Sequence, residues 1–133
     1  MVERDSTFLD RVRESLAGAE SEFVNHRYNN SANRSYYAVF QAAIYALLAA
    51  GIRPPGAMDH WGHDYVQAQF VGQLINRRKR YPVELRNSLE QNYRLREVAD
   101  YRRDPVTEVR AARAARRAET FVTAVGRDIR EAS

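Results

Sequence analysis

Apolar residues recur at intervals of three and four along almost the whole chain, and this spacing limits the fold more than any other feature. Only four prolines and six glycines interrupt the 133 residues. Intervals of three and four place side chains on one face of an α-helix. The sequence contains no alternating pattern of useful length for a β-strand and no internal repeat. It therefore predicts an all-α protein.

Capping and helix-breaking residues divide this pattern into five helices. Ser6 can cap a first helix that ends before a polar break over 25–30, and Gly51 ends a second helix that starts near residue 31. Pro82 fits the first turn of a fourth helix, and Asp104 with Pro105 fits the start of the last. The third helix is short, about 64–75. We expect one domain over residues 1–133, folded as an up-and-down bundle of four long helices and one short helix.

Composition excludes several classes of function. The chain has no cysteine, which rules out disulfides, thiolate metal sites and cysteine nucleophiles. The first ten residues are charged and unlike a secretory signal, and no apolar run reaches the roughly 18 residues of a membrane span. We therefore expect a cytoplasmic protein that does not associate with a membrane. Its net charge of +4 permits nucleic-acid binding, although solvated helix faces and ion pairs are the favoured explanation of the charge.

The second helix carries polar groups although it is apolar almost all the way round. Arg34, Tyr37 and Gln41 share one face, in a row about 10 Å long at the helical rise of about 1.5 Å per residue. An unpaired buried polar group costs a few kcal/mol, so each must have a partner. The row could accept a phosphate or a nucleobase edge, or it could form a buried polar network that fixes the packing of the helices.

The stretch from Asn33 to Ala43, Asn-Arg-Ser-Tyr-Tyr-Ala-Val-Phe-Gln-Ala-Ala, resembles the signature of HEPN-domain proteins. That family comprises small all-α proteins often encoded beside minimal nucleotidyltransferases. Later features fall where the family places them: His63 after the loop, Phe70, and the run from Arg94 to Tyr101 that ends in Ala-Asp-Tyr. The resemblance extends from about residue 9 to residue 125 and implies a HEPN-like bundle.

The resemblance also implies an activity that this sequence departs from. Many HEPN proteins resemble metal-independent ribonucleases, in which an arginine holds the scissile phosphate and a histidine moves a proton. Related sequences commonly place the histidine seven positions after the arginine that matches Arg34. Here Gln41 stands at that position, and a carboxamide cannot carry a proton near neutral pH. We therefore expect no enzymatic activity, or only a weak one.

A second polar row lies near the end of the fourth helix. Arg96 and Asp100 are four residues apart and Tyr101 follows them. Within one helix the pair is worth only a few tenths of a kcal/mol when exposed. A stronger structural interpretation pairs Asp100 with Arg34 across the bundle. Asp100 could act as a base only if its pKa were substantially raised.

The histidines suggest little further chemistry. Asp59, His60, His63 and Asp64 are donor types that metals use, but a closed site needs a defined set of ligands, so we predict no metal and no cofactor. His63 is expected to cap a helix or to hydrogen-bond a polar group of the core. The basic connector over residues 77–80 could contact phosphates, although a solvated connector is the simpler interpretation.

Together these observations favour a HEPN-like module that binds a nucleotide or RNA phosphate, or a minimal nucleotidyltransferase, as in toxin–antitoxin-type pairs. We expect a homodimer. The predicted ligand-binding residues are Arg34, Tyr37, Gln41, Arg96, Asp100 and Tyr101. One alternative is a metal-independent ribonuclease toxin that uses Arg34 or Arg96 with His63 or Asp100. Another is a purely structural interaction protein.

Overall fold

The computed structural model describes residues 2–56, 60–101 and 105–132, and the side chains within 9–56, 60–100 and 105–130. Every element in these ranges is helical, as predicted. The elements are α1 (Val2–Val24), α2 (Tyr28–Ala49), α3 (His63–Gln69), the π-helix η1 (Phe70–Arg77), the 3-10 turn η2 (Val83–Leu85), α4 (Ser88–Tyr101) and α5 (Glu108–Ala132).

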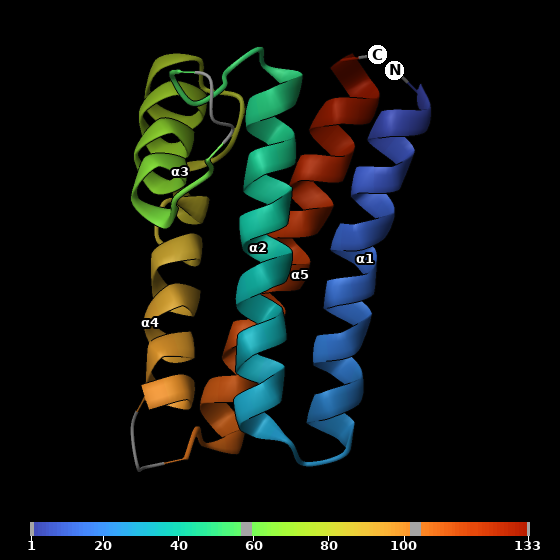
Figure 1. The fold of residues 1–133 in the computed structure, drawn as a ribbon, viewed down its shortest axis with the longest axis vertical. Helices are drawn as coiled ribbons and strands as arrows, with labels where there is room; N and C mark the ends of the chain where they lie inside the picture. Colours follow the sequence, from blue (N-terminus) through green and yellow to red (C-terminus); the bar gives the residue numbers. More distant parts are fainter. Residues whose placement is uncertain (1, 57–59, 102–104, 133) are drawn as a thin grey trace.

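The four long helices α1, α2, α4 and α5 run alternately up and down (Figure 1). Helix α2 lies in the middle and packs against α1, α4 and α5. The short α3 and the π-helix that continues it lie on the same side of α2 as α4. They lie at the end of the bundle where α2 finishes, and α4 extends from there towards the end where α2 begins. The predicted up-and-down bundle is therefore confirmed. Within the described ranges, no helix combines the length and the apolar character needed to cross a bilayer.

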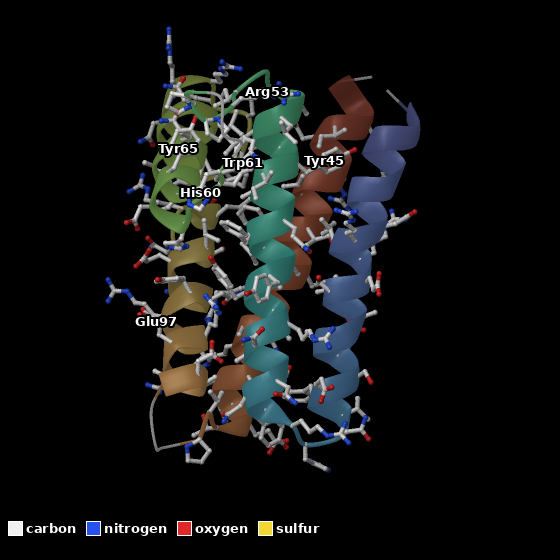
Figure 2. The ribbon with its side chains drawn as sticks, in the orientation of Figure 1. Tyr45, Arg53, His60, Trp61, Tyr65 and Glu97 are labelled. Carbon is white, nitrogen blue, oxygen red and sulfur yellow. The ribbon has the colours of Figure 1, made fainter. Side chains whose placement is uncertain are left out.

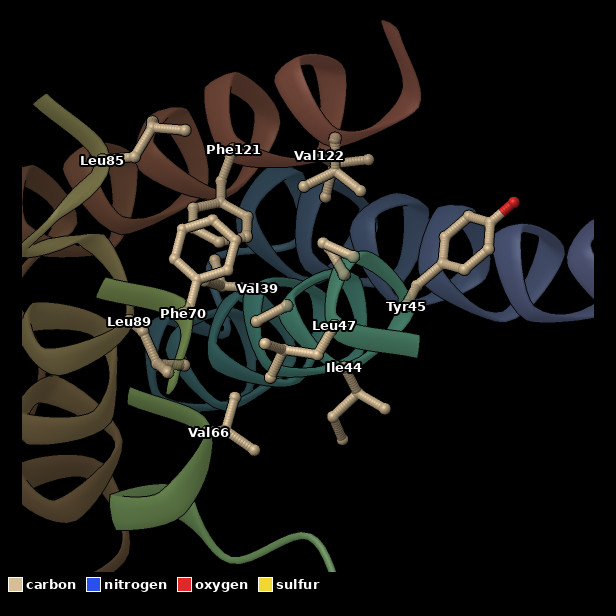
Figure 3. Packing of buried hydrophobic residues seen from close by; sticks show 14 of the residues in the cluster. Val39, Ile44, Tyr45, Leu47, Val66, Phe70, Leu85, Leu89, Phe121 and Val122 are labelled. Carbon is tan, nitrogen blue, oxygen red and sulfur yellow. The ribbon is translucent and has the colours of Figure 1, made fainter. Parts of the chain in front are cut away.

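The core forms where α2 meets the other helices (Figure 3). Leu47 of α2 is fully buried, and the rings of Phe70 and Phe121 pack with their centroids 4.8 Å apart. Burying a side chain of this size stabilises the fold by about 1.5–3 kcal/mol. Trp61, which lies just before α3, is partly buried and packs against this cluster. Apolar residues from α2, η1 and α5 thus form the larger of two core clusters, and a smaller cluster joins Ala32 of α2, Leu95 of α4 and Ala111 of α5. Together the two clusters fix the helices that carry the site.

The predicted C-terminal end of α2 was accurate, whereas the predicted starts of α1 and α2 were not. Gly51 has a φ of +78°, and its N–H and that of Ile52 donate to the carbonyls of Leu48 and Leu47 (3.0 and 2.9 Å). This is the glycine-ended arrangement that the sequence predicted. Ser6 does not cap the first helix, because α1 already begins at Val2. Helix α2 begins at Tyr28, inside the predicted polar break.

Two proline-based predictions were wrong. Pro82 has an extended ψ of 154° and precedes the 3-10 turn, and α4 begins only at Ser88. Pro105 precedes α5, which begins at Glu108. The Thr107 hydroxyl accepts a hydrogen bond from the N–H of Arg110 at 3.2 Å and so caps this helix. Asp104, the predicted cap, lies outside the described residues.

The third predicted helix continues as a π-helix rather than as an α-helix. The N–H of Arg78 donates to the carbonyl of Gln73, five residues earlier, at 2.9 Å. Phe70, Leu74 and Ile75 are all buried in this wider turn. Apolar positions at steps of four and one suit either helix type, so the spacing did not distinguish them.

Candidate functional site

The polar row on α2 is divided between two neighbouring helices. The Ser15 hydroxyl of α1 donates to Oε1 of Gln41 at 2.8 Å. The Arg34 side chain lies over Gly18 of α1, and its Nη1 is 3.1 Å from the position that a Cβ at Gly18 would occupy. Arg34 and Gln41 therefore belong to the contact between α1 and α2. Tyr37 instead lies near α4, where its ring meets the guanidinium of Arg96.

The predicted pair between Arg34 and Asp100 is not formed. Oδ2 of Asp100 lies 3.3 Å from Nε of Arg96 on its own helix. Asn33 of α2 donates from Nδ2 to Oδ1 and Oδ2 of Asp100 at 3.3 and 3.5 Å. Successive residues of a helix point about 100° apart, so Asn33 faces α4 while Arg34 faces α1. Asp100 therefore interacts across the bundle with Asn33, the residue that precedes Arg34.

Arg96 is held between aromatic rings. Its guanidinium carbon lies 5.3 Å from the ring centroids of both Tyr36 and Tyr37, a cation–π arrangement. Its Nε is buried and makes no geometrically satisfactory hydrogen bond within the described residues, although it lies in ion-pair range of Asp100. Tyr37 is 38% exposed, so one ring of this arrangement is open to solvent. We call Asn33, Tyr36, Tyr37, Arg96 and Asp100 the Arg96 cluster.

A second set of contacts shares Tyr36 and surrounds His63. Nδ1 of His63 lies 3.2 Å from the Tyr36 hydroxyl, and Nε2 lies 3.0 Å from Oε2 of Glu90. The imidazole stacks on Tyr93, with 3.7 Å between centroids and 17° between planes. Nε of Arg94 donates to the other oxygen of Glu90 at 3.1 Å. We call Tyr36, His63, Glu90, Tyr93 and Arg94 the His63 cluster.

The charge states follow from these contacts. The hydrogen bond with His63 lowers the pKa of Glu90 and outweighs the opposing effect of burial, and Arg94 lowers it further. Burial raises the pKa of Tyr36 well above its ordinary value, and the Arg96 charge offsets this only in part. Tyr36 is therefore a neutral phenol facing His63, and Glu90 is a carboxylate on the other side of the ring. A neutral imidazole satisfies both contacts when Tyr36 donates to Nδ1 and Nε2–H donates to Glu90.

The two clusters differ in what they offer a ligand. The His63 side chain is only 10% exposed, and both ring nitrogens already have partners. This confirms the expectation that His63 partners a polar group of the core. The Arg96 side chain is 25% exposed beside the exposed Tyr37 ring. The Arg96 cluster is therefore the more accessible of the two to an anion.

The structure separates the five predicted ligand-binding residues whose side chains it describes. Tyr37, Arg96 and Asp100 come together, and Arg34 and Gln41 face α1 instead. The side chain of Tyr101 lies outside the described residues. Sequence reasoning missed five members of the two clusters, which are Asn33, Tyr36, Glu90, Tyr93 and Arg94. The spacing of Glu90, Tyr93 and Asp100, at steps of three and seven, was the available signal for a shared face of α4.

The remaining polar candidates do not form a site. Among the described residues, no three histidine or acidic side chains are placed to hold a metal ion. Asp59 lies outside those residues, and His60 is exposed near α3 (Figure 2). In the basic connector, Arg78 donates to the carbonyl of Ala50 at 3.1 Å and Arg80 to Asp128 at 2.8 Å. These contacts tie the connector to the rest of the bundle.

Comparisons with known proteins agree with this fold. The protein named Putative toxin MJ0605, from Methanocaldococcus jannaschii, is 26% identical over 132 residues, which cover 97% of this chain and 91% of that protein. A model of the HEPN domain matches residues 6–129, which include all of α2 and α4 and both clusters. The chain therefore belongs to the HEPN domain family.

Proposed function

We propose that this chain is a toxin-type HEPN protein that binds RNA through the Arg96 cluster. One observation carries the proposal: the Arg96 guanidinium lies against two tyrosine rings, one of them exposed, and its Nε lacks a satisfactory hydrogen bond. Guanidinium groups bind phosphate through paired N–H donors, and tyrosine rings stack on bases. The cluster thus offers a phosphate contact and a stacking surface side by side.

The proposal retains Tyr37 and Arg96 from the predicted ligand-binding set as residues that touch the ligand. Asp100 would orient Arg96 instead, because a carboxylate repels phosphate, and Asn33 would hold the Asp100 carboxylate. The toxin class is supported by the relative named as a putative toxin, which aligns with almost the whole chain. A homodimer and a minimal nucleotidyltransferase partner remain part of the proposal. Light scattering coupled to size-exclusion chromatography tests the dimer, which would have twice the mass of the chain.

RNA binding can be measured by the fluorescence anisotropy of a labelled 12-nucleotide oligouridine in 50 mM NaCl with EDTA. Tyr37→Leu is expected to weaken binding by about 5- to 150-fold, because stacking of one base on an aromatic ring contributes about 1–3 kcal/mol. Arg96→Gln is also expected to weaken binding. Arg11→Gln removes an exposed arginine from α1 and serves as the matched control. Wild-type affinity in both cluster variants would overturn the proposal.

A metal-independent ribonuclease is the second candidate, and the contacts of His63 favour it. The carboxylate of Glu90 orients an imidazole next to a neutral tyrosine and close to the rings that hold Arg96. In such a reaction the imidazole accepts the proton of the attacking 2′-hydroxyl and the 2′-oxygen bonds to phosphorus. The bond from phosphorus to the 5′-oxygen breaks, and the 5′-oxygen takes its proton from the imidazolium, which returns to the neutral imidazole. The burial of His63 and its two occupied nitrogens explain our preference for binding.

Cleavage in EDTA separates the two candidates. We expect the wild-type protein to leave labelled RNA intact over hours. Cleavage by the wild type that disappears in both His63→Ala and Glu90→Gln, with helicity by circular dichroism unchanged, would establish the ribonuclease. Glu90→Gln is included because it keeps the size of the side chain while removing the charge that orients His63.

A further inference from the structure

Two adjoining cavities lie between α4 and α5, and their described linings contain no residue of the Arg96 cluster and only Arg94 of the His63 cluster. The first has a volume of about 310 Å³ and includes Arg94 and Leu95 of α4. The second has a volume of about 300 Å³ and includes Leu85 of η2 and Ser88 at the start of α4. Arg113 and Arg117 of α5 line both of them. We call these two cavities the α4–α5 groove.

The groove is strongly basic. Its first cavity is lined by four arginines and no acidic residue among the described side chains: Arg94, Arg110, Arg113 and Arg117. The second adds Arg116, with Glu84 as the one acidic residue of its described lining. Arg94 is already paired with Glu90, on the opposite wall from α5. No ion pair within the described residues neutralises the four arginines that α5 contributes.

One of these arginines is held in place by a buried residue. Nε of Arg117 donates to Oδ1 of Asn92 at 2.8 Å. Asn92 is fully buried, and its Nδ2 donates to the carbonyl oxygens of Ala114 at 3.2 Å and Ser35 at 3.5 Å. The asparagine is thus fixed by α2 and α5, and it fixes Arg117 in turn. Arg117 is therefore a positioned part of the groove.

The arginines also repel one another. Burial lowers the pKa of Arg117, and the charge of Arg113 lowers it further. A bound anion would offset this repulsion and replace water around the half-buried guanidinium. The side of α5 that faces the groove therefore has the electrostatic character of an anion-binding surface.

The shape of the groove identifies the anion. Arg110, Arg113 and Arg117 span about 10 Å along α5, at about 1.5 Å per residue, and Thr120 extends the lining by about 5 Å. No aromatic ring is among the described lining residues, so the groove offers contacts to phosphates and not to stacked bases. A protein interface of this size would need a larger apolar centre than Leu85, Leu95 and Val98 provide.

We propose that the α4–α5 groove binds the phosphate backbone of a single RNA strand. The inference rests on the proposed RNA binding for its ligand, but it concerns a different surface. The Arg96 cluster lies on the side of α4 that faces α2, and the groove lies on the side that faces α5. An RNA strand long enough to pass around α4 contacts both, whereas a trinucleotide contacts only one.

Salt dependence tests the inference. The double variant Arg110→Gln/Arg113→Gln removes two exposed guanidiniums that make no side-chain hydrogen bond among the described residues. Each lost contact to a single-stranded phosphate lowers the slope of log affinity against log salt by about 0.7, which corresponds to about fivefold at 0.1 M salt. We therefore expect the affinity for the labelled 12-mer to fall about 25-fold at 0.1 M NaCl. The negative slope of log affinity against log salt should become shallower by about 1.4. The double variant Arg11→Gln/Arg13→Gln removes the same charge from α1 as the control.

The outcomes separate this inference from the proposed function. A groove variant that matches the α1 control overturns the groove while leaving RNA binding at Arg96 intact. Loss of affinity in the groove variant with none in Arg96→Gln supports the groove and overturns the Arg96 cluster as the binding site. Polyglutamate can be compared with unlabelled RNA as a competitor at the same charge concentration. If polyglutamate displaces the labelled 12-mer equally well, the ligand is an acidic protein and the choice of RNA is overturned. A wild-type protein that binds no RNA in 50 mM NaCl overturns both proposals.

Discussion

Replacing Asn92 by alanine is expected to destabilise the protein strongly, although Asn92 lies in neither cluster. The side chain is fully buried and makes contacts to α2, to α5 and to Arg117. A neutral hydrogen bond contributes about 1 kcal/mol to stability, and one from a charged group about 1.5–3 kcal/mol. The contact at 3.5 Å is long and adds little. The free energy of unfolding is therefore expected to fall by about 3 kcal/mol. The range is about 2–4 kcal/mol, because the half-buried Arg117 side chain can form hydrogen bonds with water once Asn92 is removed.

Urea denaturation followed by circular dichroism at 222 nm measures this loss. We expect a lower midpoint at an unchanged slope, since the surface exposed on unfolding stays nearly the same. A loss of 3 kcal/mol in a domain of this size corresponds to a melting temperature lower by about 10 °C. Asn76→Ala removes an exposed asparagine from the end of η1 and is expected to change stability by less than about 0.5 kcal/mol.

A double-mutant cycle isolates the contact with Arg117. The coupling between Asn92→Ala and Arg117→Ala is expected to be about 1 kcal/mol or more, because the two side chains interact directly at 2.8 Å. A coupling near zero, or a loss in Asn92→Ala no larger than that in Asn76→Ala, would refute the reasoning. It would show that Asn92 neither holds the three helices together nor positions Arg117.

Three further predictions concern the helix contacts. Gly18→Ala is expected to raise stability by up to about 1 kcal/mol, since alanine favours a helix and the end of the flexible Arg34 side chain can shift from the added Cβ; a lower urea midpoint would contradict this. Gln41→His is expected to create no RNA cleavage in EDTA, because this position faces α1, so cleaved RNA on a gel would place catalysis there. The pKa of Glu90 is lower in the folded than in the unfolded state. The contribution of Glu90 to the free energy of unfolding is therefore complete above about pH 4.5 and is lost as the pH falls through the lowered pKa. The difference in stability between wild type and Glu90→Gln should therefore shrink below that pH in urea titrations, and a difference that grows on acidification would contradict the assigned contact with His63.

Much of the fold followed from the spacing of apolar residues, because burial of one helix face is what that spacing encodes. The order of the helices and the glycine that ends α2 were predicted correctly. The errors concerned the positions at which helices begin after a proline. Pro82 and Pro105 both fit the start of a helix, yet each lies in a short non-helical stretch before it. A proline restricts its own φ and leaves open how many residues later the helix begins.

The candidate site was harder to predict, because the sequence does not say which neighbour each face of a helix meets. Arg34 and Tyr37 are three residues apart and were expected to act together, but one contacts α1 and the other α4. The choice depends on the rotation of α2 about its axis, which the packing of all its neighbours determines. Asn92 shows the same limit, since its buried position follows from contacts with α2 and α5 that no local pattern reveals.

Helix α4 separates the two proposed binding surfaces, and this position has a thermodynamic consequence. Glu90, Tyr93 and Arg96 project towards α2 and α3, whereas Arg94 and Leu95 line the groove towards α5. A rigid helix cannot shift or rotate on one side alone. A ligand that moves α4 from one side must therefore change the affinity for a ligand on the other, and the effect must be the same in both directions. The trinucleotide affinity of the Arg96 cluster, measured with and without tripolyphosphate, would give the size and sign of that cooperativity.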